Sequence, residues 1–513
     1  MMTYETFHSL AVQQDRVCLS KEINGDMETP ISLYQKLRTP GGSFLLESVT
    51  DGVQRGRFSY MGSRPAQILT SRNNTWTLTQ TNPGADDSII RGTGRVLDQL
   101  RLMLEASPSD AAAEEGLPDF TGGAVGTLSY DLVRQYETLP DTTRDDLRLP
   151  EACLMLVDEL AAYDHARQTI VLMVSVDTTK CRHTSEAFPS GTGDLKPRGL
   201  YEAGMKKLKA LEAAVNRPAH SEHTGQISRE KGRNPRLAST ETRESFCGKV
   251  AAAKEYIRNG DIFQVVLSQR FQVYPAPDPF DTYRALRNLN PSPYLFFLDF
   301  DTFQLAGASP EMLVKVNRGK VETCPIAGTR PRGADTAEDE AYAREMLADE
   351  KERAEHLMLV DLARNDVGRV SRFGTVTVNP YMEVKKFSHV MHLVSQVQGE
   401  LAEGSTPFEA LTACLPAGTL SGAPKIRSME IIDQLETKRR GPYGGAVGYF
   451  SYNGSMDTCI TIRSVVFTGG SAYVQAGAGI VEDSVPQAEY EESVRKASGL
   501  LEVLQAPVKE AVS

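Results

Sequence analysis

The order of apolar and polar positions divides the chain into a sheet-rich first half and a mixed second half. Between positions 43 and 80, short apolar runs are separated by glycine, proline and asparagine, which is typical of strands joined by turns. The Asn73–Asn74 turn between AQILTS and WTLTQT predicts a hairpin. Alternating runs continue in ACLMLVDELAAYD and TIVLMVSVD. We therefore predict an antiparallel sheet with few helices for this half.

The second half mixes helical and strand patterns. Helices are predicted over 240–259, ending at Gly260, and over 280–289, ending before the prolines of NPSPY. The run LFFLDFDTFQLAGASPEML predicts two strands around a tight turn, and MDTCITIRSVVF predicts a strand with Arg463 inside it. GTLSGAPKIRSMEIIDQLE predicts one helix that opens near Thr419, with its positive end directed at an anion.

The composition becomes polar between Thr178 and Glu244, around one amphipathic helix over 200–215. We place a domain boundary near Ser239, with an N-terminal domain over 1–239 that contains a polar insertion near 181–238, and a C-terminal domain over 240–513. The sequence GGAVG occurs twice, beginning at residues 122 and 444, each time followed by Ser-Tyr after two residues. We interpret this repeat as a sign of two related sheets that face each other.

The stretch KERAEHLMLVDLARNDVG, residues 351–368, predicts a buried helix that carries carboxylates. Glu352 and Glu355 are three residues apart, so they lie one turn apart on one helix face and can share a hard cation. A second pair at this spacing, Glu489 and Glu492, lies in a helix predicted to begin at SVP near the C-terminus. Two helices can thus bring four carboxylates together. The spacing alone is also typical of solvated helix charges.

Other candidate residues are concentrated after position 295. Glu311 follows a strand end, where it can be an acid, a ligand or only a turn carboxylate. The segment AGTR, 327–330, lies between two prolines and offers N–H groups, a hydroxyl and a guanidinium, which suit a carboxylate ligand. His389 and His392 point to opposite faces of a predicted strand, so they do not chelate one metal, and a histidine among valines is often a core residue. Arg463 requires an acidic partner or ligand.

The composition limits the class of protein. With 513 residues, 40% hydrophobic and 24% charged, the chain is expected to be soluble and globular with two or more domains. A net charge of -11 argues against non-specific binding of nucleic acid. Neither a signal peptide nor a membrane-spanning run is recognisable, so we expect the cytoplasm. The seven cysteines are scattered, and none lies in a Gly-x-Cys-x-Gly elbow that would present a nucleophilic thiol.

Nine motifs, together with their order along the chain, resemble those of the chorismate-utilising enzymes, and most closely the branch of that family that forms anthranilate. They are PIAGTRPRG, EHLMLVDLARND, VMHLVSQVQGEL, GTLSGAPK, YGGAVGYFSYNG, DTCITIRS, QAGAGIVEDSVPQ and, in the first half, LLES with RFSYMG. The resemblance covers nearly the whole chain and is most specific over 240–504. It implies an α+β fold of two interleaved domains, whose antiparallel sheets form a sandwich with helices outside.

The resemblance also implies roles for individual residues. Mg2+ is expected at Glu355 and Glu492, with Glu352 and Glu489 nearby or bound through water. The residues implied for the substrate are Gly328, Thr329, Tyr443, Arg463, Gly477, Ala478 and Gly479. His392 is implied in proton transfer, Glu311 in departure of the C4 hydroxyl, and Thr419 in positioning the ring. A pocket for inhibitory L-tryptophan is implied at Leu46, Glu47, Ser48, Pro293, Tyr294 and Leu295.

The implied reaction belongs to tryptophan biosynthesis. Chorismate and ammonia would give anthranilate and pyruvate, and a glutamine amidotransferase subunit would supply the ammonia, the two kinds of subunit forming a hetero-tetramer. Aminodeoxychorismate synthases are an alternative, but they use a lysine where this chain has Ala327. Isochorismate and salicylate synthases use water as the nucleophile, and the LLES motif argues against membership of either group. A non-catalytic amino-acid sensor is a further alternative, which the full set of Glu355, His392, Arg463 and Glu492 disfavours.

Overall fold

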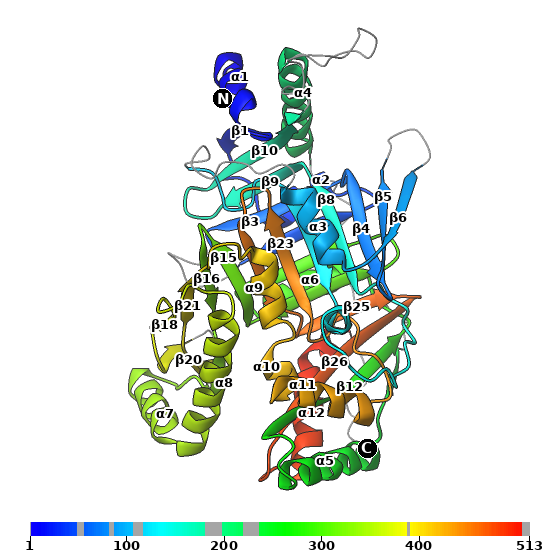
Figure 1. Cartoon of the computed structure of the whole chain (residues 1–513), viewed down its shortest axis with the longest axis vertical. Helices are drawn as coiled ribbons and strands as arrows, with labels where there is room; N and C mark the ends of the chain where they lie inside the picture. Colours follow the sequence, from blue (N-terminus) through cyan, green and yellow to red (C-terminus); the bar gives the residue numbers. More distant parts are fainter. Residues whose placement is uncertain are drawn as a thin grey trace.

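Two large antiparallel sheets form the centre of the molecule, with helices around them (Figure 1). The computed structural model describes residues 2–48, 56–81, 87–105, 116–179, 197–218, 235–386 and 390–504. The polar stretches on either side of the helix near 200–215, and His389, lie outside these residues.

The first sheet contains 12 strands among the described residues. In spatial order they are β1 (Arg16–Asn24), β10 (Thr169–Asp177), β9 (Glu159–Asp164), β3 (Phe58–Ser63), β2 (Ser43–Glu47), β13 (Tyr294–Asp299), β14 (Gln304–Ser309), β25 (Ser464–Thr468), β26 (Ser471–Ile480), β12 (Gln264–Tyr274) and β11 (Arg236–Ser239), and the short β22 (Gly422–Ala423) also pairs with β12.

The second sheet contains 11 strands, and a separate sheet of three strands lies beside it. The order in the second sheet is β18 (Thr377–Val378), β21 (Val397–Glu400), β16 (Lys320–Thr323), β15 (Met312–Asn317), β24 (Met456–Ile460), β23 (Ala446–Ser451), β7 (Gly123–Leu128), β8 (Ala152–Val157), β4 (Gln67–Arg72), β5 (Thr75–Gln80) and β6 (Ser88–Thr93). The order in the small sheet is β17 (Ile326–Pro331), β20 (Val390–Val394) and β19 (Glu383–Lys386).

Helices surround the two large sheets and the small sheet. They are α1 (Tyr4–Gln13), α2 (Pro30–Leu37), α3 (Val96–Glu105), the 3₁₀ helix η2 (Tyr130–Gln135), α4 (Pro197–Val215), α5 (Arg243–Arg258), α6 (Pro279–Leu289), α7 (Thr336–Ala348), α8 (Glu350–Gly368), α9 (Pro407–Cys414), α10 (Gly418–Ser421), α11 (Lys425–Leu435) and α12 (Pro486–Val503). Figure 1 shows α8 on one side and α10, α11 and α12 on the other side of the lower part of the molecule.

Three hydrophobic clusters correspond to the layers of this sandwich. The middle cluster joins residues of both sheets, for example Phe44 and Phe296 of the first with Met155 and Tyr449 of the second. A second cluster packs helices such as α2, α5, α6 and α12 on the first sheet, and a third packs α3, α8 and α9 on the second. The predicted α+β sandwich with helices outside is therefore confirmed.

Strands from both halves of the sequence occur in both large sheets. β2 pairs with β13, with Leu46 opposite Phe296, and β7 pairs with β23, with Gly126 opposite Gly448. The repeated GGAVG sequences thus form neighbouring strands of one sheet, and the prediction that they mark two facing sheets is wrong. A Cβ atom at Gly126 would lie 2.0 Å from the carbonyl oxygen of Cys153 on the next strand, so close backbone packing requires glycine here. The proposed domain division at residue 239 remains a prediction.

Local signals explain several element boundaries. Thr29 and Thr406 form capping boxes at the starts of α2 and α9, each followed by a proline. Asn73 and Asn74 adopt φ values of 49° and 57°, as the two-residue hairpin between β4 and β5 requires. The single helix predicted from Thr419 is wrong, because α10 ends at Ser421 and α11 begins only at Lys425, after the strand residues of β22 and a proline.

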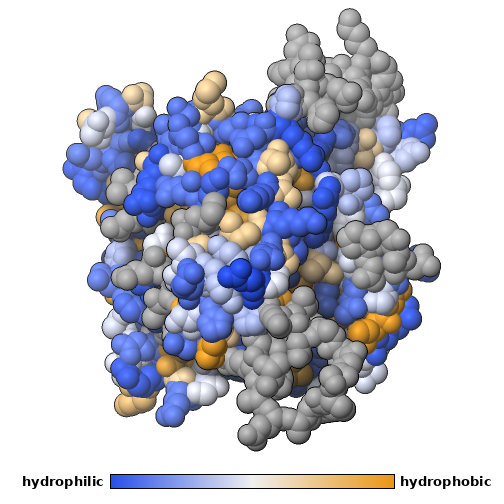
Figure 2. Space-filling view, turned by 90° about the horizontal axis from the view of Figure 1, so that it is seen from above, coloured by the Kyte–Doolittle hydropathy of each residue, from blue (hydrophilic) through white to orange (hydrophobic). Residues whose placement is uncertain are grey.

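The surface seen from the end that carries α1 and α4 is mostly hydrophilic, with separate hydrophobic patches (Figure 2). None of the helices in the described part of the chain has the length and hydropathy needed to cross a membrane.

Candidate active site

The carboxylates predicted on two helices influence one another electrostatically. Asp349 caps α8 by accepting hydrogen bonds from the N–H groups of Lys351 and Glu352, at 3.0 and 3.2 Å. The protein around Glu355 displaces part of its hydration, and this effect, followed by the charge of Glu352, raises the pKa of Glu355. Glu492 of α12 also raises the pKa of Glu355, so the carboxylates of both helices act on the same group.

The facing side of α12 carries Glu489, Glu492 and Lys496. The Lys496 ammonium lies 2.7 Å from a carboxylate oxygen of Glu492 and donates to the carbonyl oxygen of Gly477 at 3.2 Å. Burial raises the pKa of Glu489, Glu492 adds to this effect, and Ser484, Lys496 and Lys351 oppose it. Sequence reasoning missed Lys496, although its spacing of four and seven residues from the two glutamates places it on their helix face.

The donor set suits a hard divalent cation. Like charge helps to raise the pKa values of Glu355 and Glu489, so a bound cation would relieve repulsion between these carboxylates and their neighbours Glu352 and Glu492. Glu352 is instead paired with Arg330, at 2.9 Å, and Glu492 with Lys496. Within the described residues, no three His, Cys, Asp or Glu side chains lie close enough together to hold a metal ion. Ion binding would therefore require these side chains to move.

Glu311 and Arg463 lie where the chain passes from one large sheet to the other. Glu311 joins β14 to β15, and Arg463 joins β24 to β25. The predicted continuous strand through Arg463 is wrong, because residues 461–463 break it and Arg463 has a φ of 51°. The N–H of Ala308 donates to the Arg463 carbonyl at 3.0 Å, and the N–H of Ile460 donates to the Glu311 carbonyl at 3.0 Å. These bonds hold the two crossovers side by side.

Glu311 has the environment of a general acid. Burial raises its pKa to about 7, although Thr419, Lys496 and Arg463 oppose this effect. The Thr419 hydroxyl of α10 donates to a Glu311 carboxylate oxygen at 3.3 Å. Both residues line a cavity of about 470 Å³, including its open mouth. The cavity extends along α8 between side chains that include Leu359, Ala363, Asp366 and Cys414.

Arg463 presents a largely buried guanidinium to the same region. Its Nη1 donates to the carbonyl oxygen of Lys496 at 2.7 Å, and burial lowers its pKa. Within the described residues, no carboxylate oxygen lies within 4.0 Å of its guanidinium nitrogens. Tyr443, Glu311 and Glu492 act on its pKa in the opposite direction, which places all three near it. Of the two alternatives predicted for Arg463, an acidic partner does not contact its guanidinium within the described residues, so we expect the other, an acidic ligand, such as a carboxylate of a bound molecule.

The small sheet positions His392, Gly328 and Thr329. The pairing of β17 with β20 is irregular between Ala327 and Arg330, and Gly328 adopts a φ of 59°. The Gly328 carbonyl lies 2.7 Å from His392 Nδ1 and therefore accepts its proton, which assigns Nε2 as the acceptor nitrogen of the neutral ring. Burial lowers the pKa of His392. The Thr329 hydroxyl lies 3.2 Å from the same nitrogen.

Glycines on β26 allow its neighbours to approach closely. A Cβ atom at Gly477 would lie 2.4 Å from the Leu267 carbonyl, and one at Gly479 would lie 2.7 Å from the Gln264 amide nitrogen. Ala478 is opposite Leu267 in the register of β12 and β26. Only the Gly477 carbonyl, through Lys496, is directly connected to the charged residues above.

The residues implied for an inhibitor come together from distant parts of the sequence. Leu46 and Glu47 of β2 pair with Phe296 and Leu295 of β13. The buried Glu47 carboxylate accepts hydrogen bonds from Tyr283 and Arg287 of α6, so it is already paired. Ser48 follows β2, Pro293 precedes β13, and Tyr294 is the first residue of β13. The Tyr294 hydroxyl donates to Asp457 at 3.0 Å. No described contact tests whether these residues bind an inhibitor.

Comparison with known proteins decides the family. The family model described as chorismate binding enzyme matches residues 42–502. The chain belongs to the chorismate-binding enzymes. Among relatives in this family, anthranilate synthase component 1 of Acetivibrio thermocellus is 45% identical over 505 residues, covering 98% of each chain. The protein of the same name from Thermus thermophilus is 43% identical over 486 residues, covering 94% of this chain and 97% of the relative.

Solved structures of chorismate-binding enzymes share the fold. Anthranilate synthase component I from Streptococcus pneumoniae superimposes with a TM-score of 0.72 at 38% identity, covering 93% of this chain and 98% of the other. The menaquinone-specific isochorismate synthase from Escherichia coli has a TM-score of 0.69 at 18% identity, covering 98% and 99% of the two chains, and shows the fold alone.

Proposed function

We propose that this chain is the chorismate-converting subunit of anthranilate synthase, which forms anthranilate and pyruvate from chorismate and ammonia in tryptophan biosynthesis. The observation that carries the proposal is that Arg463 interacts electrostatically with Glu311 and with Glu492 of α12, while Glu492 interacts in the same way with Glu355 of α8. Chorismate is a dicarboxylate that must lose a hydroxyl group. An enzyme that converts it must supply a group that binds a carboxylate, a protonated acid that donates to the hydroxyl, and a site for a metal cation. Names of relatives that are up to 45% identical over nearly the whole chain support the same activity.

The residues around this space have separate tasks in the proposed reaction. Arg463 and Tyr443 bind the pyruvyl carboxylate, while Gly328, Thr329 and the backbone of 477–479 line the substrate. Mg2+ would be held by Glu355 and Glu492, with Glu352 and Glu489 nearby or through water. When bound, the ion would neutralise the ring carboxylate and withdraw electron density from the ring.

Proton transfers then follow from the pKa values. Ammonia forms a bond to C2 as the C4 hydroxyl leaves, and protonated Glu311 gives its proton to that hydroxyl, which departs as water. The ammonium group formed at C2 then returns one proton to the Glu311 carboxylate and becomes an amine. Thr419 orients the Glu311 carboxyl. Loss of the C2 proton to His392, whose lowered pKa keeps it neutral, restores an aromatic ring. The ring–oxygen bond to enolpyruvate breaks in the same stage, and the released enolpyruvate takes up a proton to become pyruvate.

Ala327 favours ammonia over a protein amine as the nucleophile. This side chain is 9% exposed and carries no amine, whereas the aminodeoxychorismate synthases described above use a lysine at this position. None of the seven cysteines lies in a nucleophile elbow, so a partner amidotransferase would release ammonia from glutamine.

The decisive experiment is product analysis with the purified chain. Chorismate, Mg2+ and ammonium at alkaline pH are expected to yield anthranilate and pyruvate in equal amounts, detected by chromatography. Glutamine in place of ammonium is expected to yield anthranilate only after an amidotransferase subunit is added. Absence of anthranilate with ammonium would overturn the proposed activity, and glutamine turnover by the chain alone would overturn the need for a partner.

His392→Met is expected to separate the two stages of the reaction. Because His392 removes the C2 proton after ammonia has added, the variant should consume chorismate and accumulate the aminated intermediate, visible as a separate chromatographic peak. His165→Met is the matched control, because His165 also bonds to a hydroxyl, that of Ser59 at 2.7 Å, in the other half of the chain. Complete loss of chorismate consumption in His392→Met would contradict this order of steps.

Ser48→Phe is expected to abolish inhibition by tryptophan while activity remains. We propose that tryptophan binds beside β2 and β13 and favours an arrangement that binds chorismate less well, so each ligand should weaken the other by the same factor. Phenylalanine at position 48 would fill that space. Titration of activity with tryptophan checks this, with Ser48→Ala as the control that keeps the space open. Wild-type activity that does not respond to saturating tryptophan would disprove the regulatory site.

A further inference from the structure

A buried ion pair between Glu436 and Arg440 lies behind the proposed chorismate site. Their side chains are only 5% and 2% exposed. Nε and Nη2 of Arg440 donate to the two carboxylate oxygens of Glu436 at 2.9 and 2.7 Å. Removing both charged groups from water offsets much of the attraction between them, so a buried ion pair adds little to the stability of the fold. Stability alone therefore does not explain why Glu436 and Arg440 are paired at this place.

The remaining guanidinium donors connect two elements of the site. Nη1 of Arg440 donates to the carbonyl of Leu420 at 2.6 Å, and Nη2 donates to the carbonyl of Val266 at 2.7 Å. Leu420 follows Thr419 in α10, a four-residue helix with no side-chain cap. A helix this short has little stability of its own. Its bond to Arg440 therefore helps to fix where the Thr419 hydroxyl lies.

The carboxylate of Glu436 connects the pair to the glycine strand. Its Oε1 accepts hydrogen bonds from the N–H and the hydroxyl of Ser268, both at 2.8 Å. Ser268 is opposite Gly477 in the pairing of β12 with β26, and its hydroxyl accepts a bond from the Gln475 amide at 2.9 Å. The ion pair is thus connected to Gly477 through Ser268.

Aromatic rings complete the contacts of the guanidinium. The Arg440 guanidinium carbon lies 4.6 Å from the ring centre of Tyr130 and 5.7 Å from that of Tyr443. Both distances allow attraction between the cation and the ring. Tyr443 is one of the two residues proposed to bind the pyruvyl carboxylate, so Arg440 contacts a third part of the site.

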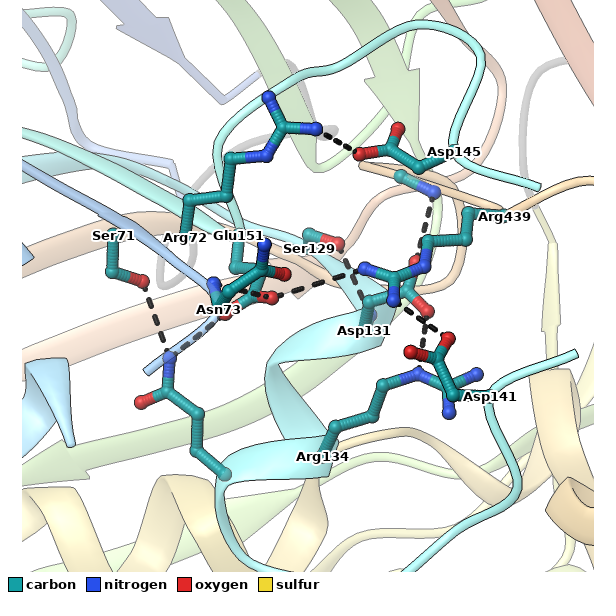
Figure 3. A network of polar contacts seen from close by, with 12 residues as sticks. Ser71, Arg72, Asn73, Ser129, Asp131, Arg134, Asp141, Asp145, Glu151 and Arg439 are labelled. Atoms are coloured by element: carbon teal, nitrogen blue, oxygen red, sulfur yellow. Dashed lines mark hydrogen bonds and ion pairs between the residues drawn. The ribbon is translucent and has the colours of Figure 1, made fainter. Parts of the chain in front are cut away.

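Residues of the N-terminal half hold the two neighbours of Arg440 in the chain, and Figure 3 shows the contacts around one of them, Arg439. Arg439 donates to Asp141 at 2.7 Å, and the N–H of Gly441 donates to Asp131 at 3.3 Å. Asp131 is itself paired with Arg134 of η2 at 3.1 Å. This network belongs to the N-terminal half of the chain and holds the segment while the Arg440 side chain extends toward the site.

We propose that Arg440, held by Glu436, is a positioning residue that sets Thr419, Tyr443 and the Gly477 strand relative to one another without touching the substrate. This role rests on the proposed function. Lysine cannot replace it, because one compact ammonium cannot bind both oxygens of Glu436 and also reach the two carbonyl groups.

The test is a double-mutant cycle that combines Arg440→Lys with Thr419→Ala. Arg440→Lys is expected to lower kcat/KM for chorismate by about 100-fold, as displacement of a reacting group by roughly 1 Å does, and to raise KM through Tyr443. If Arg440 acts through Thr419, the second substitution should cost much less in Arg440→Lys than in the wild type. A solely structural role would change the folded fraction and leave the two effects additive.

Arg16→Lys is the matched control. Arg16 also has a carboxylate partner, Asp158 at 2.8 Å, and a tyrosine ring, that of Tyr452 at 3.7 Å, but it contacts no residue of the site. Its kcat and KM should equal those of the wild type. If Arg440→Lys does not fold, Glu436→Gln replaces it in the cycle, since the amide oxygen still accepts from Ser268.

Two results would overturn the positioning role: wild-type kcat and KM in the folded Arg440→Lys variant, or additive effects in the cycle. The wild-type chain is assayed first with chorismate and ammonium. Failure to form anthranilate would refute the proposed function, whereas an active wild type with an additive cycle would refute the role of Arg440 alone.

Discussion

Glu492→Gln is expected to lower anthranilate formation by on the order of 100-fold or more, because loss of groups one shell beyond a metal ligand already costs about 10–100-fold. The substitution removes one of the two carboxylates proposed to bind Mg2+ directly and leaves Lys496 without its ion-pair partner. The fold should persist, since Glu492 is only partly buried. Calorimetric titration with Mg2+, with and without chorismate, and steady-state kinetics at increasing Mg2+ would measure the loss.

Glu491→Gln provides the matched control. Glu491 precedes Glu492 on α12, is exposed, and accepts a hydrogen bond from Gln487 at 2.6 Å, away from the other carboxylates. The substitution Glu491→Gln removes the same charge from the same helix but outside the proposed site. The activity and the Mg2+ titration of this variant should therefore match those of the wild type. Full turnover of the wild type in excess chelator would exclude the proposed metal dependence.

Glu311→Gln is expected to lower kcat by about 100-fold or more, which is the usual contribution of a general acid. The raised pKa of Glu311, about 7, also predicts a pH dependence. The protonated form gives the proton, so kcat/KM should be highest below this pKa and should fall as the pH rises through about 7. The glutamine variant should lack that decrease.

The pH profile requires a constant concentration of free ammonia. Ammonium must lose a proton before it can attack, so a constant total concentration would add an unrelated rise with pH. Glu322→Gln is the control, because Glu322 lies on β16 and accepts from Gln396 at 3.0 Å. A wild-type profile without a decrease near the pKa of Glu311, or a Glu311→Gln profile identical to it, would contradict the general-acid role.

Much of the secondary structure follows from local pattern. The hairpin at Asn73 and Asn74 forms as predicted because its residues accept positive φ. The carboxylate helix runs from Glu350 to Gly368, close to its predicted bounds, because Asp349 caps its start. The pattern failed at Arg463, because a run of β-branched residues favours a strand but does not show where the chain changes sheets.

Helix spacing predicted which glutamates share a face, and this was sufficient to propose a cation site. It did not predict their partners. Arg330 of β17 and Lys496 pair with Glu352 and Glu492, and the first of these contacts depends on packing of the small sheet against α8. The same limit applied to Arg440, whose carbonyl partners are backbone groups and have no signal in the sequence.

The sequence by itself determined the α+β class, the order of the motifs and the residue types of the site, because these depend on periodicity and on chemistry carried by single side chains. Only the tertiary structure decided how the two halves combine. It placed the repeated GGAVG strands beside each other and brought Glu311 and Arg463 together at neighbouring sheet crossovers. Both outcomes depend on hydrogen bonds between segments that are far apart in the chain. Such pairing is stabilised when the two sheets bury their apolar faces against each other, and local sequence preference does not specify it.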